Sequence, residues 1–80
     1  MTIKQIGEWC MEHIDMRRRD SYVERGRYTI HTVEFESGDI YEQTEEQIGY
    51  WDKRVKIYLN GAIEHETVYH YDNFGWKEAV

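Results

Sequence analysis

A chain of 80 residues with a formal net charge of −6 accommodates one domain, residues 1–80, with a thin hydrophobic core. The single cysteine, Cys10, excludes an intramolecular disulfide, and no apolar run is long enough for a signal peptide or a membrane span. The negative charge disfavours direct nucleic-acid binding, because phosphate neutralisation needs Lys and Arg. We therefore expect a cytoplasmic protein that does not bind membranes and is suited to a basic partner.

The first predicted element is a helix over residues 2–19. Thr2 is a suitable N-cap, and apolar residues recur at spacings of three and four from Ile3 to Ile14. Gly7 costs about 1 kcal/mol relative to alanine in a helix, which suggests close approach to a neighbour. Arg17–Arg19 would end the helix, where the helix dipole favours cations.

Residues 22–36 are predicted to form one strand. Tyr28 and Ile30 share one side of it, and Val33 and Phe35 share the other. Either a β-bulge near residues 31–32 places all four on one face, or the strand is buried on both faces.

A turn at residues 37–39 is followed by a returning strand that begins at Ile40. Residues 44–50 are open to two interpretations. They continue as strand, or they form a single helical turn, because Thr44-Glu45-Glu46-Gln47 fits a capping box.

The clearest local element is a hairpin over residues 50–71, centred on Asn60-Gly61. A two-residue loop would set Ile57 opposite Glu64. A three-residue loop with a G1 bulge at Gly61 would instead pair Ile57 with Ile63 and Lys56 with Glu64. Matched cross-strand pairs contribute about 0.2–1 kcal/mol each, so we predict the three-residue loop.

These elements predict an α+β fold in which the N-terminal helix packs on a three- or four-stranded antiparallel sheet. The tail, Asn73-Phe74-Gly75-Trp76, is expected to fold back so that its rings cover one end of the sheet.

No pattern in the sequence indicates a reaction. The four histidines are spread over three elements without metal-ligand spacing, and a pairing of Cys10 with His13 lacks a third catalytic residue. The glycines are scattered singly, so there is no phosphate loop. We predict no catalytic residues, no metal and no cofactor.

Charge is sorted along the sequence. Five arginines lie between residues 17 and 27, whereas no Lys or Arg occurs between Tyr28 and Asp52. Such an acidic run is most often a solvated face. The sharper hypothesis is a surface that docks on a basic protein, with two tyrosines as aromatic anchors. The predicted contact residues are Glu34, Glu36, Asp39, Tyr41, Glu42, Glu45, Glu46 and Tyr50.

In size, charge and composition the chain is comparable to phage-encoded decoys such as anti-restriction and anti-CRISPR inhibitors, although no family motif is present. The leading hypothesis is thus a non-enzymatic inhibitor of a nucleic-acid-handling protein. One alternative is a small RNA- or single-stranded-DNA-binding module that uses the Arg17–Arg27 segment. A structural homodimer is another alternative, because a thin core is often completed by a symmetric partner.

Overall fold

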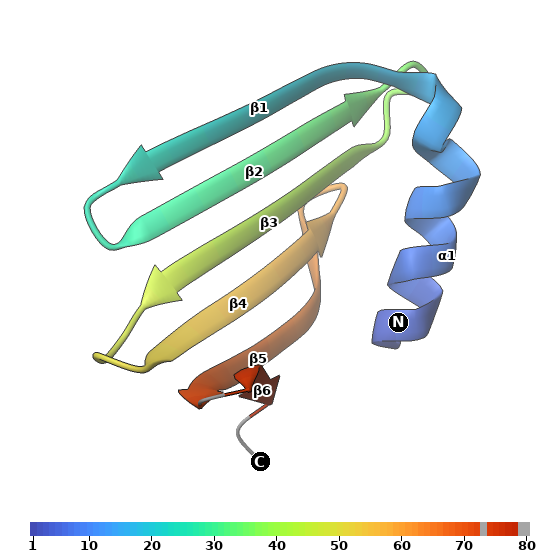
Figure 1. Ribbon diagram of the computed structural model, residues 1–80. Helices are drawn as coiled ribbons and strands as arrows, with labels where there is room; N and C mark the ends of the chain where they lie inside the picture. The colour runs from blue at the N-terminus through green and yellow to red at the C-terminus, as the bar shows by residue number, and fades with distance from the viewer. Residues whose placement is uncertain (73, 79–80) are drawn as a thin grey trace.

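The computed structural model describes residues 1–72 and 74–78, and all counts below refer to that part of the chain. It contains one α-helix, α1 (Ile3–His13), a 3-10 turn, η1 (Ile14–Met16), and six strands. The strands are β1 (Arg17–Arg25), β2 (Tyr28–Phe35), β3 (Ile40–Gln47), β4 (Asp52–Leu59), β5 (Ala62–Asp72) and β6 (Gly75–Glu78). They form a single antiparallel meander in chain order, with α1 beside one face (Figure 1). The chain is therefore α+β, but the predicted sheet of three or four strands is wrong.

Of the two additional strands, β1 comes from the segment that carries the arginines and β6 comes from the tail. Helix α1 begins with the predicted Thr2 cap, where the Thr2 hydroxyl accepts from the Gln5 amide at 3.1 Å and Gln5 Oε1 accepts from the Thr2 amide at 2.8 Å. It ends at His13, so Arg17–Arg19 begin a strand instead of ending a helix. A two-residue turn with Gly26 at φ +58° then separates β1 from β2. The predicted single strand over residues 22–36 is therefore two strands.

Strand β2 has no bulge where one was predicted. Its pairing with β3 runs without a shift from Tyr28 to Glu34, so Ile30 and Val33 face opposite sides. Val33 and Phe35 are buried on the side of α1, and Ile30 is half-buried on the other side. The apolar residues of β2 therefore lie on two faces, but the expected burial of both faces is not observed, because Tyr28 is exposed and Ile30 is only half-buried. Strand β3 continues to Gln47, which rules out a helical turn starting at residue 44.

The β4–β5 hairpin turns through two residues, not three. Asn60 and Gly61 both have positive φ, and Leu59 pairs directly with Ala62. A bulge between Ile57 and Tyr58 then changes the register, so Lys56 lies opposite Glu66 at 3.8 Å. The predicted pairs of Ile57 with Ile63 and of Lys56 with Glu64 are wrong. The observed register places Ile57 opposite His65 and Val55 opposite Thr67.

The hydrophobic core lies between α1 and the sheet and is small. Ile6 of the helix packs on Val55 and Ile57, with Cys10, Tyr41 and Tyr69 around them. Trp9 meets Phe35 edge to face, with ring centroids 5.3 Å apart. The accessible surface is 5944 Å². A monomer of this mass is expected to expose about 5,200 Å². A single-layer sheet that α1 covers only in part explains the excess.

Replacing Gly7 with alanine is expected to raise the free energy of unfolding by about 1 kcal/mol. Gly7 lies inside α1, and a Cβ built there meets no atom within 4 Å among the described residues. The close approach expected at this glycine is therefore not observed. Thermal and urea unfolding would measure the gain, and a Gly7→Ala variant less stable than wild type would contradict this view of the helix.

Candidate interaction surfaces

The eight residues predicted to bind a partner do not share one face. Glu34, Glu42 and Glu46 lie on the side of the sheet away from α1, whereas Tyr41 and Glu45 lie on the side of α1. Glu36 and Asp39 flank the β2–β3 turn, and Tyr50 lies in the β3–β4 loop at the opposite end of these strands. The structure thus separates the predicted set into several groups.

Three of these glutamates have cationic partners from neighbouring strands. Arg19 Nε lies 3.6 Å from Glu34, Lys53 Nζ lies 3.5 Å from Glu45, and Arg54 lies 3.5 Å from Glu46. The acidic run has no Lys or Arg of its own, but strands β1 and β4 supply them across the sheet. Among the described residues, Glu36 and Glu42 form no ion pair, so they keep their full charge available.

Asp39 joins three segments of the fold. Its carboxylate accepts from the Ser37 hydroxyl at 2.7 Å and from Asn60 Nδ2 at 3.0 Å, and it lies 3.1 Å from His13 Nε2. The hydrogen bonds from Ser37 and Asn60 lower the pKa of the Asp39 carboxyl. Asp39 therefore fixes the β2–β3 turn to the end of α1 and to the β4–β5 turn.

The lowered pKa of Asp39 predicts a pH dependence. A carboxyl of this kind stabilises the fold above its unfolded pKa of about 3.9, and the contribution is lost as pH falls through the folded pKa. At pH 5, wild type should be more stable than an Asp39→Asn variant, and this margin should shrink as the solution becomes more acidic. Urea unfolding across this range provides the measurement. A margin that does not change with pH would contradict the assignment.

Tyr41 and Tyr50 differ as interaction anchors. Tyr41 is half-buried beside the core, its hydroxyl donates to Gln43 Oε1 at 2.7 Å, and burial raises its pKa to about 12. Tyr50 is 87 % exposed. Only Tyr50 presents its ring for contact with a partner.

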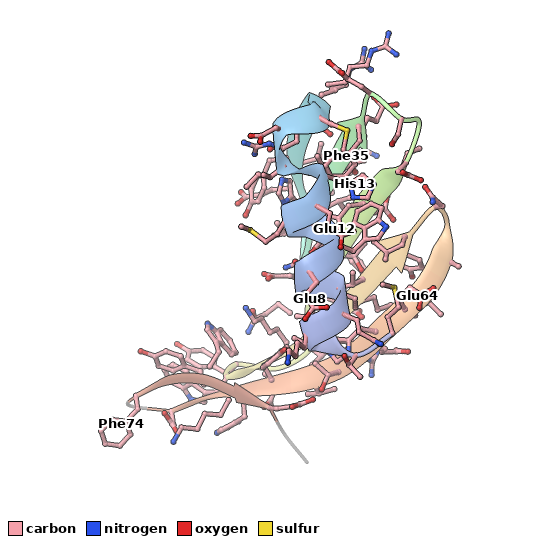
Figure 2. The ribbon with its side chains drawn as sticks, turned by 90° about the vertical axis from the view of Figure 1, so that its right-hand side faces the viewer. Glu8, Glu12, His13, Phe35, Glu64 and Phe74 are labelled. Atoms are coloured by element: carbon pink, nitrogen blue, oxygen red, sulfur yellow. The ribbon has the colours of Figure 1, made fainter. Side chains whose placement is uncertain are left out.

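Tyr50 belongs to a set of five exposed aromatic residues at one end of the sheet, which we call the aromatic end. Tyr50 meets Trp51 at 5.0 Å between ring centroids, Trp51 stacks on Tyr71 at 5.6 Å, and Tyr71 meets Trp76 at 5.4 Å. Phe74, 90 % exposed, completes the set and projects from the tip of the sheet far from α1 (Figure 2). The members are Tyr50, Trp51, Tyr71, Phe74 and Trp76.

The aromatic end is held by the sheet. Trp51 accepts a backbone hydrogen bond from Tyr71 at 2.7 Å, and Trp76 pairs with Tyr71 across the β5–β6 ladder. Lys53 Nζ lies 4.5 Å from the centre of a Trp76 ring, within cation–π range. The expected folding back of the tail is thus seen for Trp76, whereas Phe74 does not cover the sheet, and Asn73 lies outside the described residues.

Helix α1 carries carboxylates that the predicted set did not include. Glu8 and Glu12 lie one turn apart on the outward side of the helix (Figure 2), and Asp15 follows in η1. None of the three forms an ion pair within residues 1–72 and 74–78. Like charges at this spacing destabilise a helix by about 0.2–0.5 kcal/mol. The i, i+4 spacing of Glu8 and Glu12 was the available sequence signal for this surface.

The Cys10–His13 pair considered from the sequence is not formed. One ring nitrogen of His13 lies 2.7 Å from the Trp9 carbonyl oxygen and the other lies 3.1 Å from Asp39. Burial raises the pKa of the Cys10 thiol, which disfavours the reactive thiolate. Cys10 instead lines an apolar groove of about 510 Å³ between α1 and the sheet. Within the described residues, no three His, Cys, Asp or Glu side chains are grouped to hold a metal ion.

The comparisons with known proteins give no family assignment: no family model, curated protein or solved structure matches this chain. In the part of the chain that the structure describes, no helix is long and apolar enough to cross a membrane. The function must therefore be argued from the surfaces themselves.

Proposed function

We propose that this chain is a small, non-enzymatic protein-binding domain that docks on a larger basic protein through its aromatic end. The observation that carries the proposal is the row of mutually contacting, exposed rings from Tyr50 to Trp76, with Phe74 beside it. Contiguous exposed apolar patches mark interaction sites, and Trp and Tyr are the residues most enriched among interface hot spots.

The anchoring of this row favours tight binding. Tyr and Trp have few rotatable bonds, and the stacked pair of Trp51 and Tyr71 is already ordered by the β-sheet. Side chains that are ordered before binding lose less conformational entropy on association. We therefore assign the affinity of the complex to the aromatic end.

Charge has a different role in the proposal. The chain carries −6 overall, and Glu8, Glu12, Glu36 and Glu42 are exposed or half-buried carboxylates without ion pairs among the described residues. A negative field accelerates encounter with a positive surface and suppresses encounter with a negative one. Nucleic-acid-handling proteins have such positive surfaces, so an inhibitor of the phage-decoy type remains the proposed class.

The alternative nucleic-acid binder is less well supported. Single-strand binding combines cations with stacking rings along one groove. Here Arg17, Arg18 and Arg19 begin β1 beside α1, whereas the aromatic end lies at the other end of the strands, in the β3–β4 loop and on β5 and β6 (Figure 1). Only Arg25 and Arg27 of the five arginines flank the β1–β2 turn, which shares that end: the Arg27 carbonyl oxygen accepts from the Gln47 amide at 2.9 Å. Arg17 and Arg19 are in addition paired with Asp20 and Glu34.

The experiment is a capture from lysate by the tagged protein, with and without nuclease, eluted by a salt gradient. We expect a discrete basic protein that survives nuclease treatment, elutes as salt rises, and is lost when Trp51 and Phe74 are both replaced by alanine. Met11→Ala is the matched control, because Met11 is an exposed apolar side chain on α1. Recovery of nucleic acid alone would favour the arginine segment and overturn the proposal.

A further inference from the structure

Strand β1 presents a long open edge. All nine of its residues are exposed, and within residues 1–72 and 74–78 it pairs only with β2. Open edges of this length invite pairing with a further strand. No member of the aromatic end lies on β1 or β2, so this edge is a separate surface from the proposed docking site.

The register of β1 with β2 shows which backbone groups are free. Arg25 and Tyr28 close the two-residue turn and form a hydrogen-bonded pair. Every second residue before Arg25 in β1 therefore also directs its backbone N–H and C=O groups toward β2. The N–H and C=O groups of the intervening residues, Asp20, Tyr22 and Glu24, therefore point outward from the sheet.

We propose that this edge pairs with β1 of a second copy of the chain, antiparallel, about a two-fold axis at Ser21. In this register Asp20 lies opposite Tyr22 and Arg18 lies opposite Glu24, and symmetry forms each pair twice. Neither Arg18 nor Glu24 forms an ion pair among the described residues, so both are available for this contact.

The charges of β1 select that register over its neighbours. A symmetric pairing that uses the outward backbone groups moves in steps of two residues. Relative to the Ser21-centred register, a shift of the second strand by two residues in one direction places Asp20 opposite Glu24 and Arg19 opposite Arg25. The same shift in the other direction places Asp20 opposite the Asp20 of the second copy. Like charges directly opposite destabilise a sheet. The Ser21-centred register places only Arg17 opposite Arg25, at the ends of the strand.

The bulge at Arg18 and the run of arginines disfavour pairing with a strand that lacks a matching glutamate.

A charge exchange tests the proposal. We expect sedimentation equilibrium to show a monomer–dimer equilibrium for the wild type. Glu24→Arg or Arg18→Glu alone should weaken dimerisation at least about tenfold, and the double variant Arg18→Glu/Glu24→Arg should restore it, because opposite charges again face each other. Circular dichroism checks that each variant is folded.

A second variant tests the backbone. Tyr22→Pro removes an outward N–H and should abolish the dimer while leaving the β1–β2 ladder intact. The aromatic-end variant should dimerise normally, which separates this proposal from the proposed function. A wild type that stays monomeric at millimolar concentration, or a dimer that the double variant does not restore, would overturn the proposal.

Discussion

Replacing Ile57 with alanine is expected to lower the free energy of unfolding by about 3 kcal/mol. Ile57 is 6 % exposed and packs with Ile6 of α1 and Val55 of its own strand. Removal of its branched side chain leaves a cavity at the centre of the contact between helix and sheet. A domain of this length has a total stability of about 4–12 kcal/mol, so the substitution should remove about a quarter to three quarters of it.

Urea unfolding followed by tryptophan fluorescence and by circular dichroism measures this loss. Ile63→Ala is the matched control, since Ile63 lies in the same hairpin but is 50 % exposed. Its replacement should lower the free energy of unfolding by less than about 1 kcal/mol. Equal losses for the two variants would show that the core does not lie between α1 and β4.

Replacing Trp51 with alanine is expected to weaken partner binding by about 30-fold or more, equivalent to at least about 2 kcal/mol. Trp51 contacts both Tyr50 and Tyr71, so its removal divides the aromatic row. Because Trp51 is 52 % exposed, the same change should cost only about 1 kcal/mol of fold stability.

The affinity is measured by titration with the protein that the wild type captures. Met11→Ala provides the comparison, as an exposed apolar residue outside the aromatic end. If Met11→Ala weakened binding as much as Trp51→Ala, the contact would lie on α1 and not at the aromatic end.

Local signals in the sequence predicted some of the fold correctly. The Thr2 cap, the apolar spacing of Ile3, Ile6 and Cys10, and the position of the turn at Asn60-Gly61, although not its length, are each encoded within a few residues. The errors arose where tertiary pairing decides. Arg17–Arg19 fit a helix end by charge, but pairing of β1 with β2 places them in a strand. Gly26 lacked the Asn or Asp that usually marks a tight turn, so the hairpin was predicted as one strand.

The candidate site was harder to predict for the same reason. The acidic run seemed unneutralised because its cations, Lys53 and Arg54, follow it in the chain and approach it only across the β3–β4 ladder. The aromatic row joins Trp51 to Tyr71, twenty positions apart, through a register that depends on the bulge in β4–β5. Without that bulge, the two-residue turn would place Trp51 opposite His70.

The most direct test of the binding proposal is to measure association and dissociation rates with the captured protein. Three forms are compared: wild type, Trp51→Ala/Phe74→Ala, and Glu8→Gln/Glu12→Gln/Glu36→Gln. We expect the aromatic variant to dissociate much faster with a similar association rate, whereas the carboxylate variant should associate more slowly and show a weaker salt dependence. Unchanged dissociation of the aromatic variant would contradict the assignment of the contact to the aromatic end.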